Sequence, residues 1–184
     1  NYRSGVDGLR VSNSTKGGIT FAASTTQNGI HMITVVLGVE AVDGDPYARF
    51  VATSSLMNYV VRTFVSSIVV KEGDPYGKSK ATVMDGKSET VLAVAKKDFY
   101  IVEKQGSQAE PKIQFKSNQE SFRAPVKSGT NLGKLHYTDP DKIGRGYLED
   151  QEPTVDMVAG RTIEKSFFLK VWWNEFVRYV NEKL

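Results

Sequence analysis

The side chains that most often do chemistry in proteins are sparse in this 184-residue sequence. Cysteine is absent, which excludes disulfides, thiolate metal sites and a cysteine nucleophile. The two histidines, His31 and His136, lie in predicted strands, and no spacing indicates that they converge with carboxylates on a metal ion. The segment GTNLGK at 129–134 is similar to a phosphate-binding loop, but it is one residue too short, and Leu135 stands where serine or threonine would bind magnesium. The residues alone therefore predict no metal site, no cofactor and no complete catalytic site.

The composition is that of a soluble, folded protein. Hydrophobic residues make up 40% of the chain and charged residues 24%, which argues against a disordered tail or a protein with several membrane spans. The net charge of +3 comes from 24 basic and 21 acidic residues that are scattered and form no basic block. Nucleic acid is therefore not expected as a partner.

The first third of the chain predicts three strands and a helix. Asn28-Gly29 separates two runs rich in β-branched and aromatic residues, and this dipeptide favours the positive φ angles of a tight hairpin. A shorter extended run precedes the hairpin, so we expect a three-stranded antiparallel meander. Apolar residues then recur at three- and four-residue spacing between 46 and 64, which predicts an amphipathic helix that packs on this sheet.

The sequence pattern changes between residues 66 and 162. Short alternating runs follow one another there, among them SSIVVKEG, ETVLAVAK and GKLHYTD, with Gly, Pro, Asp and Asn between them. Regularly spaced short strands of this kind are typical of a small all-β sandwich.

The last stretch, 163–184, returns to helical periodicity and gathers apolar and aromatic residues on one half of the helix. Such a helix is too short and too charged to span a bilayer, and it suits a position flat in the membrane interface. Its aromatic stripe is equally suited to packing on the β domain or on a partner, and the spacing does not separate these alternatives. The predicted membrane-contact residues are Phe168, Leu169, Trp172, Trp173, Phe176 and Val180.

Four segments resemble one protein family in the same order along the chain. They are VDGLRVSNSTKGG (6–18), DPYARFVATSSLMNYV (45–60), APVKSGTNLGKL (124–135) and FFLKVWWNEFVRYVNEKL (167–184). The chain resembles the low-molecular-mass penicillin-binding proteins that are serine-type D-alanyl-D-alanine carboxypeptidases, in particular the forms of Gram-positive cocci.

The resemblance implies an α+β fold in three parts. Residues 1–65 would be an antiparallel sheet-and-helix remnant of a penicillin-recognising, β-lactamase-like domain. Residues 66–162 would be the small all-β sandwich domain, and residues 163–184 an amphipathic membrane-surface helix.

One of the family's three active-site motifs, Lys-Thr-Gly, falls on Arg10, Val11 and Ser12. The resemblance implies that a cation and a hydroxyl bind the substrate's terminal carboxylate, and that a residue without a side chain lets the ligand lie against the strand. Arg10 keeps the charge, whereas Val11 lacks the hydroxyl and Ser12 adds bulk. Arg49 matches a family arginine near the carboxylate end of the cleft, so Arg10 and Arg49 are the implied substrate-binding residues. Without the resemblance, Arg49 is interpreted as an exposed residue of the first helical turn or a salt-bridge partner.

The other two motifs, Ser-x-x-Lys with the nucleophile and Ser-x-Asn, do not occur in these residues. The chain is therefore expected to be the last part of a longer protein and to be inactive by itself. The implied partners are a peptidoglycan stem peptide or a β-lactam, and the membrane surface on the extracellular face of the cytoplasmic membrane. Because the predicted sheet lacks its preceding strands and helices, self-association is also expected.

Two hypotheses about function follow. In the first, the chain is a piece of an enzyme that removes the terminal D-alanine from peptidoglycan pentapeptides through an acyl-serine intermediate. In the second, it is a non-catalytic, membrane-anchored scaffold or interaction module at the cell surface. The altered third motif favours the second hypothesis, and the rest of the chain, which shows no sign of decay, favours the first.

Overall fold

The structure of the protein is a computed structural model that describes residues 5–14, 18–39, 47–108, 110–147, 149, 151–167, 171–173, 176–177 and 179–180. The chain divides into two compact units. Unit 1 consists of Asn1–Ser67 with Val102–Gln108, and unit 2 consists of Ile68–Ile101 with Ala109–Leu184.

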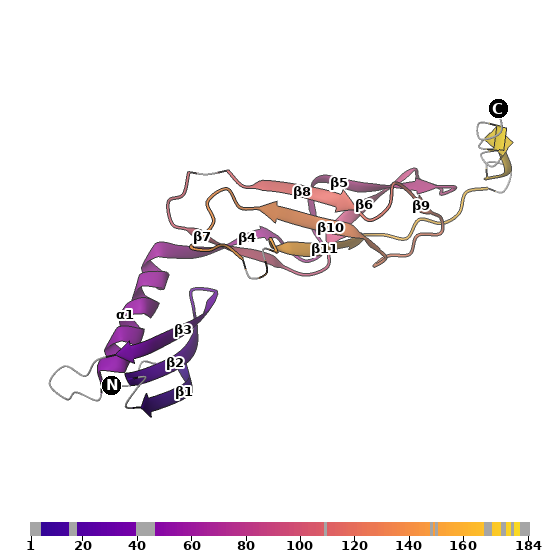
Figure 1. Cartoon of the computed structure of the whole chain (residues 1–184). Helices are drawn as coiled ribbons and strands as arrows, with labels where there is room; N and C mark the ends of the chain where they lie inside the picture. The colour runs from indigo at the N-terminus through magenta and orange to yellow at the C-terminus, as the bar shows by residue number, and fades with distance from the viewer. Residues whose placement is uncertain are drawn as a thin grey trace. The chain divides into compact units, whose positions relative to one another are not determined.

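Unit 1 is a three-stranded antiparallel sheet covered on one face by a helix (Figure 1). The strands β1 (Val6–Ser14), β2 (Gly18–Gln27) and β3 (Ile30–Val39) lie in the order β1-β2-β3. The predicted meander is therefore confirmed. Asn28 and Gly29 connect β2 to β3 with φ angles of 52° and 74°, as the tight hairpin turn requires.

The helix α1 (Ala48–Thr63) packs on this sheet through an apolar face. The helix confirms the amphipathic helix expected at 46–64, and residue 46 lies outside the described residues. Met57 of α1 is fully buried against the inward side chains of β2 and β3. The buried core of unit 1 consists of Phe21, Ala23, Ile30, Met32 and Met57.

The opposite face of this sheet carries large apolar side chains in contact with solvent. Residues of β3 alternate between the two faces, and Ile33, Val35 and Leu37 are 61%, 57% and 74% exposed. Unit 1 therefore buries one sheet face and leaves the other apolar and open.

Two strands, β4 (Phe64–Val70) and β7 (Phe99–Lys104), pair in a two-stranded ribbon that passes from unit 1 into unit 2. Unit 2 is built on a six-stranded sheet in the order β8-β10-β11-β6-β5-β9. All its pairs are antiparallel except β5 with β9, which is parallel. The strands are β5 (Pro75–Met84), β6 (Thr90–Ala95), β8 (Lys112–Ser117), β9 (Phe122–Arg123), β10 (Asn131–Thr138) and β11 (Thr154–Ala159).

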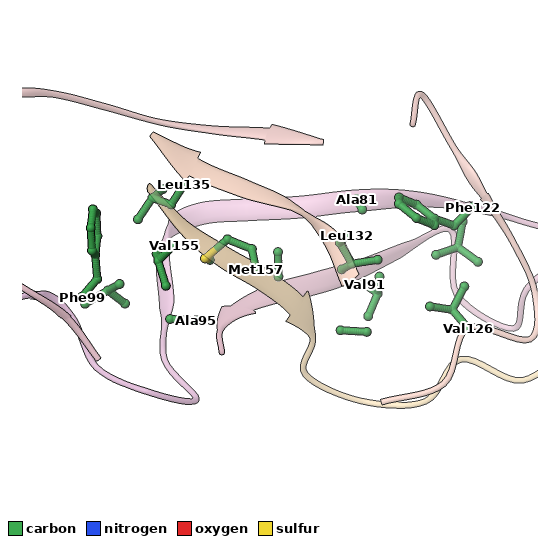
Figure 2. Packing of buried hydrophobic residues seen from close by; sticks show 14 of the residues in the cluster. Ala81, Val91, Ala95, Phe99, Phe122, Val126, Leu132, Leu135, Val155 and Met157 are labelled. Carbon is green, nitrogen blue, oxygen red and sulfur yellow. The ribbon is translucent and has the colours of Figure 1, made fainter. Parts of the chain in front are cut away.

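One face of the six-stranded sheet forms the core of unit 2 (Figure 2). Every second residue of β6 and of β11 is buried, as in a strand with one solvated face. On β10 the alternation is interrupted because the register shifts between Asn131 and Gly133. This bulge takes up one residue, so Leu132 and Leu135 both point into the core. The mostly β architecture agrees with the predicted β-rich domain.

The chain remains extended where the C-terminal helix was expected to begin. Ile163 forms an antiparallel bridge with Val126, and Lys165 forms one with Gly86. Ile163 is 4% exposed, and its burial in the core of unit 2 holds this stretch on the β domain. Helical residues follow at 171–173, 176–177 and 179–180. Within the described residues, no helix is both long enough and apolar enough to cross a membrane.

An ion pair stabilises the turn that receives this extended stretch. Arg123 Nε lies 3.2 Å from Asp85 Oδ2, and the Asp85 side chain is 3% exposed whereas that of Arg123 is 59% exposed. The carbonyl of Asp85 accepts a hydrogen bond from the backbone N–H of Ser166 at 2.8 Å. The turn after β5 therefore links β9 to the chain that leads toward the C-terminal helical residues.

Replacing Arg123 should destabilise the protein more than replacing a lysine in an exposed pair. Arg123→Ala removes the charged partner of a buried carboxylate, so we expect the free energy of unfolding to fall by about 1–3 kcal/mol in urea denaturation. The matched control is Lys142→Ala, since Lys142 Nζ lies 3.6 Å from Glu152 Oε1 and the Glu152 side chain is 29% exposed, whereas that of Asp85 is 3% exposed. The control should cost about 0–1 kcal/mol. Equal losses in the two variants would contradict the structural role of the Asp85 pair.

Candidate functional sites

The strand β1 carries the residues that match the third family motif, and it is an edge of its sheet. Arg10 and Ser12 are exposed, and Val11 is 55% exposed. Thr20 of β2 donates its hydroxyl to the carbonyl of Ser12 at 3.3 Å. A register shift between Gly8 and Arg10 marks a bulge just before the motif. An edge strand has a row of backbone groups that its own sheet leaves unpaired.

The two predicted substrate-binding arginines belong to different faces of this sheet. Arg10 lies opposite Ala22 in the register, on the face away from the buried Phe21 and Ala23. Arg49 stands at the start of α1, on the helix side.

A short series of contacts connects Arg49 to the motif strand. The Arg49 guanidinium carbon lies 5.5 Å from the centre of the Phe50 ring, a cation–π contact. Phe50 meets Phe21 edge to face at 5.0 Å, and Phe21 is the cross-strand neighbour of Val11. Arg49 thus borders the aromatic core beneath β1, and the structure does not bring it onto the face that carries Arg10.

The described helical residues near the C-terminus expose three of the predicted membrane-contact residues. Trp172, Trp173 and Phe176 are 63%, 59% and 49% exposed. The Phe176 ring lies 6.2 Å from that of Trp172 and 6.0 Å from that of Trp173. Val180 is half-buried, and Phe168 and Leu169 lie outside the described residues. The three rings form one aromatic cluster in contact with solvent.

A polar pocket in unit 2 was not predicted from the sequence. It has a volume of about 310 Å³ and is lined by Lys96, Lys97, Thr154 and Asp156. Period-2 alternation shows that the strand residues Thr154 and Asp156 face outward, but it does not show that Lys96 and Lys97, which follow β6, lie beside them.

Charged side chains continue from this pocket across the outer face of the sheet. Lys134 of β10 is paired in the register with Lys116 of β8 on one side and with Asp156 of β11 on the other. Lys96 follows β6, and its backbone N–H donates to the carbonyl of Asp156 at 2.9 Å. We call Lys116, Lys134, Asp156 and Lys96 the lysine row.

The charges of the lysine row affect the pKa of His136. Its cross-strand neighbours are Gln114 and Thr154. Burial lowers the pKa of His136 below its usual value, and the charges of Lys116 and Lys134 lower it further, whereas Glu152 acts in the opposite direction. Among the described residues, no group of three or more potential ligands is arranged to hold a metal ion.

Comparisons with known proteins identify a common family. Residues 64–165 match the family described as "Penicillin-binding protein 5, C-terminal domain". The chain is 27% identical over 133 residues to D-alanyl-D-alanine carboxypeptidase DacA of Haemophilus influenzae, covering 72% of this chain and 32% of the relative. It is 24% identical over 166 residues to DacA of Escherichia coli K12, covering 90% of this chain and 38% of the relative. The chain thus spans about a third of the length of these curated relatives.

Solved structures show the same likeness. A peptidoglycan synthesis regulatory factor, PBP3, from Streptococcus pneumoniae matches with a TM-score of 0.82 and 44% identity, over 89% of this chain and 44% of that chain. Penicillin-binding protein 5 from Haemophilus influenzae matches with a TM-score of 0.60 and 22% identity, over 88% of this chain and 43% of that chain. The second likeness concerns the fold alone.

Proposed function

The chain belongs to the family of the C-terminal domain of penicillin-binding protein 5, and we propose that it works as part of a D-alanyl-D-alanine carboxypeptidase in cell-wall maturation. The observation that carries this proposal is the likeness to two DacA carboxypeptidases over most of the chain. The reaction would remove the terminal D-alanine of a peptidoglycan pentapeptide. A serine hydroxyl attacks the carbonyl carbon of the peptide bond to the terminal D-alanine. That bond breaks, D-alanine leaves as the free amino acid, and water then hydrolyses the acyl-serine ester.

In this proposal unit 1 is a part of the penicillin-recognising domain, and β1 is the strand along which the substrate lies. Arg10 offers the substrate carboxylate a cation, although its planar guanidinium differs in reach and geometry from a lysine ammonium. Val11 has no hydroxyl to donate, which leaves the carboxylate one partner short. A hydrogen bond to a charged group contributes about 1.5–3 kcal/mol, so Val11 should weaken catalysis or acylation by at least about tenfold.

The missing hydroxyl of Val11 is also the observation that favours the alternative function. A protein that had lost acylation would work as a membrane-anchored scaffold or interaction module, with the β domain of unit 2 as its rigid part. The two functions differ in whether the full-length gene product forms a covalent adduct with penicillin.

Fluorescent penicillin labelling of the full-length gene product distinguishes the carboxypeptidase from the scaffold. We expect a covalent band, no label on the 184-residue chain alone, and labelling about tenfold faster in the Val11→Thr variant, which restores the hydroxyl. The matched control is Val102→Thr, the same substitution at an exposed position of β7, which should label at the original rate. A well-folded full-length product without any band would favour the scaffold.

We further propose that the C-terminal helical residues hold the protein on the extracellular face of the cytoplasmic membrane. The exposed cluster of Trp172, Trp173 and Phe176 supports this, since tryptophan favours the depth of the lipid headgroups. The β domain of unit 2 would then act as a pedestal between the membrane and the catalytic part.

Flotation with liposomes tests the membrane contact. Trp172→Ala combined with Trp173→Ala removes two large rings, so the floated fraction should fall severalfold. Tyr100→Ala is the control, because Tyr100 is an aromatic residue with 56% exposure on the β domain, and its loss should not change flotation. Unchanged flotation of the double tryptophan variant would exclude this helix as the anchor.

We also propose that the isolated chain self-associates through the apolar outer face of β3. Sedimentation velocity should show concentration-dependent dimers or larger species, because Ile33, Val35 and Leu37 gain burial only when a second surface covers them. Changing these three residues to threonine should shift the chain to monomer. Leu92→Thr is the control on the solvated face of unit 2, where Leu92 is 52% exposed. A monodisperse original chain at high concentration would contradict the proposal.

A further inference from the structure

The lysine row has an electrostatic cost that the fold offsets only in part, because Asp156 lies opposite Lys134 in the β10–β11 pair. Lys116 and Lys134 stand directly opposite each other in an antiparallel pair, and like charges in that position are destabilising. Within the described part of the chain, no ion pair involves Lys96, Lys116 or Lys134. One carboxylate among three lysines leaves the row with a net positive charge, and a like-charge pair kept on a sheet is expected where a ligand supplies further negative charge.

The bulge on β10 requires glycine beside the two paired lysines. A Cβ atom on Gly133 would collide with the backbone of Lys116 and Ser117, so only glycine permits the approach of β10 to β8. The side chain of Asn131 accepts a hydrogen bond from the Gly133 N–H at 3.0 Å and fixes the bulge. The positions of Lys116 and Lys134 are therefore set by the sheet.

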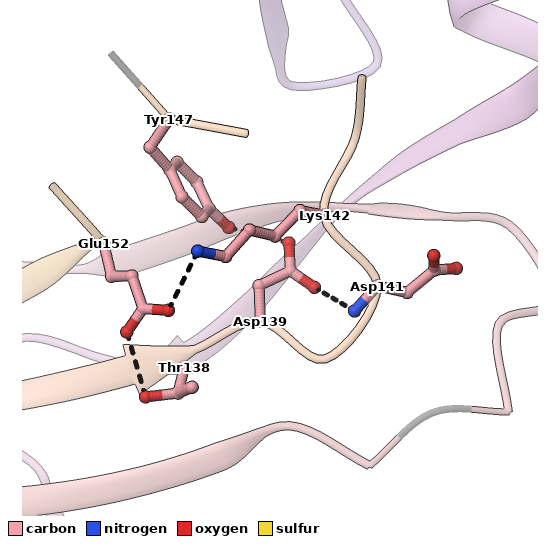
Figure 3. A network of polar contacts seen from close by, with 6 residues as sticks. All are labelled: Thr138, Asp139, Asp141, Lys142, Tyr147 and Glu152. Carbon is pink, nitrogen blue, oxygen red and sulfur yellow. Dashed lines mark hydrogen bonds and ion pairs between the residues drawn. The ribbon is translucent and has the colours of Figure 1, made fainter. Parts of the chain in front are cut away.

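Two carboxylates of the loop that joins β10 to β11, those of Asp139 and Glu152, already have partners (Figure 3). Glu152 accepts a hydrogen bond from the Thr138 hydroxyl at 3.0 Å and pairs with Lys142 at 3.6 Å. Asp139 accepts one from the Tyr147 hydroxyl at 2.9 Å and one from the backbone N–H of Asp141 at 2.9 Å. These contacts engage Glu152 and Asp139 within the loop, and among the residues that the structure describes neither forms an ion pair with the lysine row.

We propose that the lysine row and the pocket beside it bind a polyol-phosphate or sugar-phosphate chain. The row crosses four neighbouring strands, which at about 4.8 Å between strands gives a length of roughly 14 Å, more than one phosphate group fills. Lys116, Lys134 and Lys96 would bind phosphates. Asp156, within the row, accepts hydrogen bonds from hydroxyl groups, and Thr154 in the pocket donates or accepts them.

The carboxylate in the row favours such a chain over a flat anionic membrane. A lipid surface would set negative headgroups against Asp156, whereas a polyol or sugar phosphate alternates anionic groups with hydroxyls. The site lies in unit 2 and uses no residue of β1 or of the C-terminal helix. Its test therefore succeeds or fails independently of penicillin labelling and of liposome flotation.

Titration of the 184-residue chain with glycerol phosphate oligomers, followed by NMR at the two histidines, tests the proposal. Bound phosphates should favour the imidazolium form, so the resonances of His136 should move and its pKa should rise. His31 lies in unit 1 and should not respond. Inorganic phosphate and phosphatidylglycerol vesicles are the parallel probes, and both should bind the row much more weakly than the oligomer.

Two double variants distinguish specific binding at the lysine row from non-specific electrostatic binding. Lys116→Gln with Lys134→Gln should weaken oligomer binding by at least about tenfold at constant ionic strength. The control pair, Lys78→Gln with Lys80→Gln, removes the same charge from exposed positions of β5 and should change affinity less than about twofold. Thermal unfolding should show that neither pair loses stability, because the first relieves a like-charge contact.

Asp156→Asn distinguishes recognition of hydroxyls from attraction of phosphate. The substitution removes a negative charge, so pyrophosphate, which has no alcohol groups, should bind more tightly. The oligomer should bind about tenfold more weakly, because the acceptor for its hydroxyls is weakened. Equal losses in the two lysine pairs, or inorganic phosphate as effective as the oligomer, would overturn the proposal. If vesicles bind the row and the oligomer does not, the row is a membrane contact and the proposed phosphate-chain site is wrong.

Discussion

The pairing register of β8, β10 and β11 is the constraint on which unit 2 depends. Because side chains alternate between the faces of a strand, a slip of one residue would send Leu135 and Met157 to solvent. The bulge at Gly133 permits both the inward direction of Leu132 and the outward direction of Lys134. The same register therefore forms the hydrophobic core and aligns the lysine row on the opposite face.

The local signals of the chain predicted much of this fold. Asn28-Gly29 predicted the hairpin because its two φ angles must be positive, and the periodicity around Met57 predicted α1 because a helix on a sheet needs an apolar stripe. The extended backbone at Ile163 could not be predicted in the same way. Helical periodicity is a local property, whereas Ile163 is held by a bridge to a residue far away in the sequence, Val126.

The candidate sites were harder to predict than the elements, for the same physical reason. Motif matching placed Arg10 and Arg49 in one substrate site, but the face on which each lies is set by the register of β1 and by the side of the sheet on which α1 packs. The pairing of Lys116 with Lys134 is equally invisible along the chain, since each lysine alone has the ordinary pattern of a solvated strand.

The two units differ in what their open faces are suited to contact. The outer face of β3 is apolar, which indicates a surface made to be covered, whereas the outer face of unit 2 carries the lysine row, which suits solvent or a polar ligand. Arg10 and Val11 belong to unit 1, and each unit has its own buried core. Side chains that share no partner and no core act on stability and binding independently. The identity of residue 11 therefore places no constraint on the β domain, which keeps its register and its outer surface whether or not β1 takes part in acylation.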